Sequence, residues 1–446
     1  MLVETRGRDS SIDETELQFQ KLKVRIHEKL VDSLDLSMLA QVSQDNLEVE
    51  VRVVAGELCS EMAPHVSGRE RERLERELID EVFGLGPLEP LMLDPQISDI
   101  LVNNPYEVYV ERSGRLERSE VIFADSDHLI RIIQRVVSRI GRRIDESSPM
   151  VDARLEDGSR VNAVIPPLTL NGPSLSIRMF GAEPLTLDDL IASNSLSADM
   201  AEFLIGATAG RMSLLISGGT GAGKTTLLNC MTSYIPDDER LITIEDVAEL
   251  QLQHKHVVRM EARAANSEGT GEVTQRSLVR NSLRMRPDRI VVGEVRGAEA
   301  LDMLQSMNTG HEGSMTTIHA NDTRDALARL ELMVAMAGFE LPVSVVRQYI
   351  AAGIALVIHV ARLKGGIRRV MRISEITGVT ESGFTLEDIF GFEQTTVNDR
   401  GEAEGDFYVT GYRPKCLGRL RANGIRYHDE MFDRHWSRRG TPGDSV

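Results

Sequence analysis

A glycine-rich segment ending in lysine and threonine carries the most specific chemical signal of this sequence. Residues 218–226 read GGTGAGKTT, which fits G-x-x-x-x-G-K-[ST] at every fixed position. Glycines let backbone N–H groups turn inward toward phosphate oxygens, and the start of a following helix adds a favourable dipole. Lys224 suits the β- and γ-phosphates, and the Thr225 hydroxyl suits Mg²⁺. The predicted phosphate-binding residues are Gly218, Gly219, Thr220, Gly221, Ala222, Gly223, Lys224, Thr225 and Thr226.

Two apolar segments that end in acids could supply the remaining chemistry. Residues 289–294 read RIVVGE, which places Glu294 where a metal-side acid follows a buried strand. Residues 241–246 read LITIED, and Glu249 follows three positions later. Carboxyl ends of parallel strands meet at one edge of a sheet, so these acids should lie near the phosphate loop. Glu245 and Glu249 could hold a water molecule there, although a solvated acidic loop has the same pattern.

Two histidines flank a short predicted strand at residues 316–318. A histidine near a γ-phosphate can sense it through a hydrogen bond, which makes His311 and His319 candidates, but a structural role is equally open for His311. No histidine, cysteine or acidic cluster has metal-ligand spacing. The three cysteines lie far apart, so neither a zinc site nor a disulfide framework is expected.

The patterning divides the 446-residue chain into several parts. Residues 1–14 are polar and predicted to be disordered, and residues 15–83 have the periodicity of a three-helix bundle, with a capping box at Ser67 and Glu70. Short strands, hairpin turns and one helix predict an α+β domain over residues 84–183. Alternating helices and apolar strands predict an α/β domain with a mainly parallel sheet over residues 184–430, continued by antiparallel strands. Residues 431–446 are predicted to be a disordered tail.

Charge and hydropathy limit the possible partners. The formal net charge is −18, from 51 basic and 69 acidic side chains, which disfavours duplex DNA as the main ligand. The N-terminus lacks the apolar segment of a signal peptide, and prolines interrupt the uncharged stretch at residues 161–177. We expect a cytoplasmic protein that reaches a membrane only through a partner.

Four linked motifs together resemble a known family. GGTGAGKTT, TIEDVAELQL, RPDRIVVGEVRG and TGHEGSMTTIHAND are similar to the ATPases of type II secretion, type IV secretion and type IV pili. GLGPLEPLMLDPQISDILVN, MVDARLEDGSRVNAVIPP and the later TLEDIFGFEQ and TGYRPK resemble the CpaF/TadA branch, the motors of Tad (Flp) pili. The resemblance covers about residues 70–430. Type II relatives often carry a four-cysteine zinc site that this chain cannot form, and VirB-type relatives lack the N-terminal helical bundle.

The resemblance implies a role for each matching residue. Lys224 and Thr225 match the Walker A pair, and Glu294 matches the Walker B acid, which with Thr225 would hold Mg²⁺. Glu249 matches the catalytic base, with Glu245 as the second choice. His319 matches the γ-phosphate sensor, and His311 is the other histidine of that motif. Arginines of the N-terminal domain contact the nucleotide in the family, and they fall by motif at Arg160 and Arg178, with Arg154 as a further candidate.

The resemblance also implies an architecture and a function. The fold would be a RecA-like P-loop ATPase domain preceded by the small α+β domain and the three-helix bundle, assembled as a homo-hexamer. ATP hydrolysis would drive assembly, and in some systems retraction, of Tad/Flp pili through inner-membrane platform proteins, and act on pilin indirectly. A type II or type IV secretion motor, a nucleic-acid translocase and a non-catalytic nucleotide-gated scaffold are the alternatives.

Overall fold

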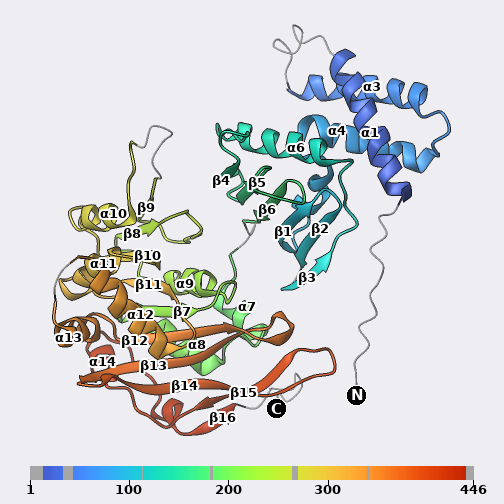
Figure 1. Cartoon of the computed structure of the whole chain (residues 1–446). Helices are drawn as coiled ribbons and strands as arrows, with labels where there is room; N and C mark the ends of the chain where they lie inside the picture. Colours follow the sequence, from blue (N-terminus) through green and yellow to red (C-terminus); the bar gives the residue numbers. More distant parts are fainter. Residues whose placement is uncertain are drawn as a thin grey trace. The chain divides into compact units, whose positions relative to one another are not determined.

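The computed structural model describes residues 14–33, 44–112, 114–180, 184–263, 270–338 and 341–437. The chain divides into two compact units, residues 1–182 and 183–446. The predicted helical region and the predicted α+β domain both belong to the first unit, and the predicted α/β domain forms the second (Figure 1). In the part of the chain that the structure describes, no helix is both long and apolar enough to cross a membrane.

Three helices open the first unit: α1 (Glu14–Ser33), α3 (Gln44–Met62) and α4 (Gly68–Phe83). Their apolar faces share a core that includes Leu30, Val51 and Leu78. The predicted capping box is confirmed: the Ser67 side chain accepts a hydrogen bond from the Glu70 backbone, and the Glu70 carboxylate accepts one from Ser67 N at 3.2 Å. Helix α1 ends at Ser33, and residues 34–43 lie outside the described part.

A six-stranded sheet forms the rest of the first unit, with the order β3-β2-β1-β6-β5-β4 and antiparallel pairing throughout. Its elements are η1 (Gly86–Leu88), α5 (Glu89–Met92), β1 (Ile97–Asn104), β2 (Glu107–Arg112), β3 (Arg115–Arg118), α6 (Ser126–Arg139), β4 (Met150–Arg154), β5 (Arg160–Val164) and β6 (Ser174–Arg178). Alternate strand residues such as Ile100, Val161 and Ile177 pack with Ile133 and Val136 of α6, so this helix covers one face of the sheet. The side chains of the intervening residues lie on the other face.

The second unit is built on a ten-stranded sheet with the order β16-β15-β14-β13-β12-β7-β11-β10-β8-β9 (Figure 1). Strands β12, β7, β11, β10, β8 and β9 are parallel, and β12 to β16 continue the sheet as antiparallel neighbours. The strands are β7 (Leu214–Gly218), β8 (Leu241–Glu245), β9 (Val257–Glu261), β10 (Arg289–Val295), β11 (Met315–His319), β12 (Leu356–Arg362), β13 (Arg368–Thr380), β14 (Gly383–Val397), β15 (Ala403–Val409) and β16 (His435–Ser437).

Helices cover both faces of the parallel strands, as the uninterrupted apolar runs predicted. Leu214 and Ile216 of β7 belong to one core, while Leu215 between them belongs to the other. The first core includes α7 (Leu187–Ala192), α8 (Ala198–Ala209), α9 (Lys224–Thr232) and α14 (Leu417–Ala422). The second includes α10 (Gln275–Ser282), α11 (Glu299–Asn308), α12 (Thr323–Met336) and α13 (Val343–Gly353). Short 3-10 turns, η2 (Lys364–Gly366) and η3 (Asp429–Phe432), complete the unit.

The predicted disordered tail at 431–446 is wrong for its first seven residues. Strand β16 pairs with β15, and Phe432 is buried against Phe203 and Phe390, with ring centroids 5.9 and 6.2 Å apart. Burial of one aromatic ring stabilises a segment by about 1.5–3 kcal/mol, which orders a stretch that is otherwise polar. Residues 438–446 lie outside the described part.

Candidate nucleotide-binding site

The phosphate loop joins the central strand β7 to α9, as predicted. Gly221 and Gly223 have φ angles of 67° and 100°, in the left-handed region that favours glycine. A Cβ atom on Gly218 would lie 2.4 Å from the carbonyl oxygen of Val360, so only glycine fits there. The glycines are therefore required by the backbone path, and α9 begins at Lys224 directly behind the loop.

The loop holds its own lysine. Lys224 Nζ donates hydrogen bonds to the carbonyl oxygens of Gly218 and Gly219, both at 3.1 Å. These contacts keep the ammonium group at the loop, where the first backbone N–H groups of α9 also lie. Positive charge and N–H donors are thus concentrated at one point, which is the arrangement that binds phosphate.

The Walker B candidate lies two strands away on the same sheet edge. β11 lies between β7 and β10, and Val295 aligns with Ile318, which aligns with Ser217. Glu294 is therefore close to the level of the phosphate loop, and its side chain is about three-quarters buried. The carboxylate accepts a hydrogen bond from Arg296 Nη2 at 2.8 Å.

The other two glutamates have different environments. Glu245 ends β8 and is buried, and its Oε1 accepts hydrogen bonds from the backbone N–H groups of Glu249 (2.8 Å) and Leu250 (2.9 Å). No described residue hydrogen-bonds its Oε2. Burial raises the pKa of the Glu245 carboxyl, which favours its protonated form. Glu245 thus fixes the loop that carries Glu249, whose own side chain is only half-buried.

β10 is shaped to accept Glu245. A Cβ atom on Gly293 would lie 2.9 Å from Glu245 Cγ, so a larger residue would push the carboxyl away. The glycine of the RIVVGE segment therefore has a packing reason that neither motif reveals alone.

The structure separates the two histidines. His319 ends β11 and aligns with Gly218, and Ala320 N donates to the Gly218 carbonyl at 3.3 Å, so His319 lies beside the phosphate loop. His311 precedes β11, with its Nδ1 3.3 Å from the Ser306 carbonyl oxygen. It lies at the opposite edge of the sheet, where the strands begin, and the structure does not bring it to the loop.

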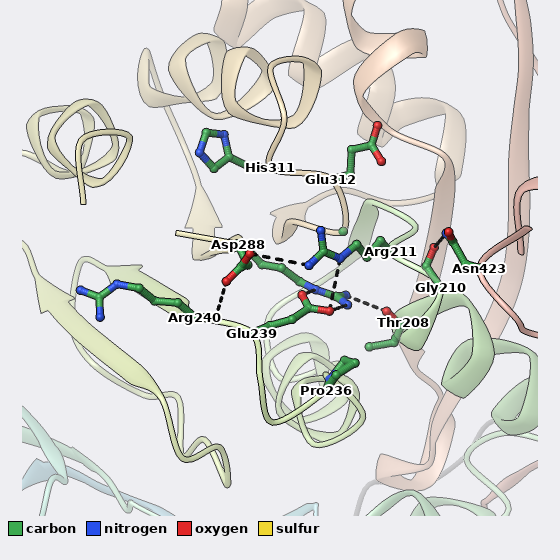
Figure 2. A network of polar contacts seen from close by, with 12 residues as sticks. Thr208, Gly210, Arg211, Pro236, Glu239, Arg240, Asp288, His311, Glu312 and Asn423 are labelled. Atoms are coloured by element: carbon green, nitrogen blue, oxygen red, sulfur yellow. Dashed lines mark hydrogen bonds and ion pairs between the residues drawn. The ribbon is translucent and has the colours of Figure 1, made fainter. Parts of the chain in front are cut away.

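A second polar network occupies that opposite edge (Figure 2). Arg289 is fully buried; its Nε and Nη2 donate to the two Glu239 oxygens at 2.6 and 2.9 Å, and its Nη1 donates to the Thr208 carbonyl at 2.6 Å. Arg211 adds a bond to Glu239 at 3.3 Å. These contacts link the starts of β7, β8 and β10, so we assign the network a structural role.

The three predicted arginines form a row on the first unit's sheet. Arg154 pairs with Arg160, and Arg160 pairs with Arg178, on the adjacent strands β4, β5 and β6. Cross-strand partners share a face, and this face is opposite to the one that α6 covers. Arg160 lies 3.9 Å from Asp152, and Arg154 lies over the Phe180 ring at 5.7 Å. The row gathers three positive charges on one sheet face.

Sequence reasoning missed two arginines beside the phosphate loop. Arg368 Nε donates to the Gly221 carbonyl at 2.9 Å, and a Cβ atom on Gly221 would lie 3.4 Å from Arg362 Nη1. Arg362 and Arg368 pair across the β12–β13 hairpin. The segment reads ARLKGGIRR, and its basic character was visible, but nothing in its spacing connects it to a loop about 140 positions earlier.

The donor atoms at this edge suit a magnesium nucleotide. The Thr225 hydroxyl and the Glu294 carboxylate offer the hard oxygen ligands that Mg²⁺ prefers. Within the described residues no three acidic, histidine or cysteine side chains form a metal cluster.

The chain is similar in sequence to known proteins. The model of a family described as "Type II/IV secretion system protein" matches residues 81–379. A Mycobacterium tuberculosis protein whose name refers to conjugal transfer is 42% identical over 305 residues, covering 67% of this chain and 86% of that protein. The type IV secretion system protein VirB11 of Brucella suis is 35% identical over 305 residues, covering 62% and 84%.

A solved structure is similar as well. The crystal structure of the VirB11 ATPase from the Brucella suis type IV secretion system, in complex with sulphate, is 32% identical in sequence. The match covers 66% of this chain and 96% of that one, with a TM-score of 0.36.

Proposed function

The chain belongs to the type II/IV secretion system protein family and is an ATP hydrolase, and we propose that it is the ATPase motor of a Tad (Flp) pilus assembly machine. The observation that carries the catalytic part is the shared sheet edge. Glu294 and His319 lie at the ends of β10 and β11. Lys224 and the loop bearing Glu249 follow β7 and β8 at the same edge.

Each residue has a defined task in this proposal. Lys224, the loop N–H groups and the start of α9 would bind the phosphates. Thr225 and Glu294 would hold Mg²⁺, which would supply positive charge to the phosphate oxygens. Glu249 orients the attacking water and accepts its proton, because its side chain is more accessible than that of Glu245. His319 donates a hydrogen bond to the γ-phosphate and reports its presence.

We propose that the arginine row also acts on the nucleotide. Like charges on directly paired strand residues are unfavourable. Asp152 beside Arg160 and Asp99 opposite Arg178 offset part of this repulsion, and an anion shared by the three arginines would offset more of it. The guanidinium groups would neutralise charge that develops on the γ-phosphoryl group. Arg178→Ala should then lower kcat at least tenfold, while Arg118→Ala, on edge strand β3 of the same sheet, should not. Equal activity of the two variants would contradict this role.

Assembly as a homo-hexamer in the cytoplasm, held at the inner membrane by platform proteins, completes the proposal. The helices α1, α3 and most of α4 precede the matched residues 81–379, so they are additions to the shared family region. We propose that these helices bind the platform protein of this particular machine. Mass photometry of the purified protein with and without ATP measures the assembly, and a monomer under both conditions would contradict it.

A secretion or conjugation motor is the second candidate, because the relatives' names refer to conjugal transfer and type IV secretion. Neighbouring genes distinguish the two: pilin and a platform protein support the pilus machine, whereas type IV secretion channel components support the alternative. Co-purification with the encoded membrane protein tests the same point biochemically. ATPase activity stimulated by DNA, and lost steeply with salt, would instead indicate a nucleic-acid translocase, which the charge of −18 disfavours.

A further inference from the structure

One arginine contacts both acidic segments of the candidate site. Arg296 directly follows β10; its Nη2 donates to Glu294 Oε2 at 2.8 Å, and its Nη1 lies 3.7 Å from Asp246 Oδ2. Glu294 is the acid assigned to the metal, and Asp246 begins the loop that carries Glu249. A single guanidinium group therefore contacts both Glu294 and the loop that carries Glu249.

The backbone of Arg296 is fixed while its side chain is accessible. The N–H groups of Arg296 and Gly297 both donate to Glu299 Oε1 at 2.7 Å, and Glu299 is buried in the first turn of α11. The Arg296 side chain is 62% exposed. It can leave Glu294 by rotation of its own bonds, without a change in the surrounding fold.

The local charges explain why a cation is needed there. The hydrogen bond to Glu294 raises the pKa of Arg296, although burial opposes the shift, and the charges of Glu294, Asp246 and Glu249 act in the same direction as the bond. Three carboxylates on adjacent segments repel one another unless a positive charge lies among them. A guanidinium group supplies that charge permanently, because it does not lose its proton in proteins.

We propose that Arg296 competes with the metal ion for Glu294. Without metal, the guanidinium neutralises the acids and occupies the carboxylate; metal binding displaces it. The site would thus discriminate against a free divalent cation, which must displace Arg296 unaided, and favour one delivered with nucleotide phosphates. This inference rests on the proposed metal role of Glu294.

The test uses the full-length protein without nucleotide and Mn²⁺ as the probe, with free Mn²⁺ measured by electron paramagnetic resonance. Arg296→Gln should bind Mn²⁺ up to about fivefold more tightly than the wild type, equivalent to about 1 kcal/mol for loss of an exposed ion pair. Arg372→Gln is the matched control, because Arg372 is 52% exposed and pairs at 2.6 Å with Asp388, which is not one of the acids that Arg296 contacts. It should bind Mn²⁺ as the wild type does.

Two further variants separate this inference from the proposal beneath it. Glu294→Gln should weaken Mn²⁺ binding, and adding Arg296→Gln to it should have no effect. If Glu294→Gln weakens binding but Arg296→Gln matches the wild type, the competition is refuted and the metal role of Glu294 stands. Tighter Mn²⁺ binding that persists in the double variant, or that appears in Arg372→Gln, would result from the change in net charge. Either result would also refute the competition between Arg296 and the metal. Unchanged binding in Glu294→Gln removes the metal role itself.

Discussion

Replacing Glu245 with alanine should release the loop that carries Glu249, whereas replacing it with glutamine should not. The Glu245 carboxylate accepts hydrogen bonds from two backbone N–H groups, at 2.8 and 2.9 Å. Glutamine keeps an acceptor oxygen for these donors and removes a buried charge. Alanine leaves both donors without their acceptor.

The size of the effect follows from burial. Leu250 is fully buried, so its N–H group loses about 1–3 kcal/mol when it has no acceptor. Glu249 is half-buried, and water can partly replace the lost bond at its N–H group. The total for Glu245→Ala is about 2–4 kcal/mol of local stability, and a displacement of Glu249 by about 1 Å would cost about 100-fold in kcat.

Protonation gives the glutamine variant a distinct signature. Because burial raises the pKa of Glu245 in the folded protein above 4.5, its contribution to stability is fully present below pH 4.5 and lost as pH rises through the folded pKa. At any pH above the folded pKa, the ionised carboxylate is therefore destabilising. Glu245→Gln should be as stable as the wild type or more stable at pH 7.

Hydrogen exchange and turnover together provide the assay. Peptides covering residues 246–250 should exchange about 30- to 700-fold faster in Glu245→Ala, which corresponds to about 2–4 kcal/mol, and at nearly the wild-type rate in Glu245→Gln. Glu249→Gln should exchange normally but lose about 100-fold or more in ATP turnover. If Glu245→Gln abolishes turnover while Glu249→Gln hydrolyses ATP normally, Glu245 is the base and the reasoning is wrong.

Two further predictions follow from the arginines. Arg368→Ala should weaken binding of a fluorescent ATP analogue about two- to tenfold, because the Gly221 carbonyl loses a charge-assisted hydrogen bond that shapes the loop. Unchanged affinity would show that the loop keeps its shape without this contact. Glu239→Ala should destabilise the second unit by about 3–5 kcal/mol, because it leaves the buried Arg289 charge uncompensated. Glu331→Ala, which removes the partner of Arg347 in a more exposed pair, should cost at most about 1 kcal/mol. Burial alone would raise the pKa of Glu239, but the hydrogen bonds and positive charges of Arg289 and Arg211 together outweigh burial and lower the pKa below 4.5. This stabilisation should therefore be complete above pH 4.5 and lost as pH falls through the folded value. Thermal melts of both variants between pH 3 and pH 7 measure it, and equal losses in the two variants would contradict the assignment.

Local chemistry made part of this molecule predictable. The path of residues 218–224 needs left-handed backbone angles, which only glycine adopts cheaply, so a strand, a tight turn and a helix were predicted there and are confirmed. The capping box at Ser67 was likewise recognised because its two bonds join residues three positions apart. Signals of this kind lie within one short window of sequence.

The remaining features depend on contacts between distant segments. The contact of Arg368 with Gly221 spans 147 positions, and Gly293 is small because Glu245, on another strand, needs the space. The burial of Phe432 depends on rings more than 40 and more than 200 positions away, so its polar surroundings suggested disorder. Arg296 shows the same limit, because the motif gives its position but not its bond to Glu294 or its place beside Asp246.

The central claim is that Gly218–Thr225 and Glu249 form one hydrolytic site. Steady-state ATP hydrolysis and ATP binding, measured side by side on wild type, Lys224→Ala and Glu249→Gln, test it most directly. We expect turnover in the wild type, loss of binding and turnover in Lys224→Ala, and retained binding without turnover in Glu249→Gln. Undiminished hydrolysis by Lys224→Ala would contradict it.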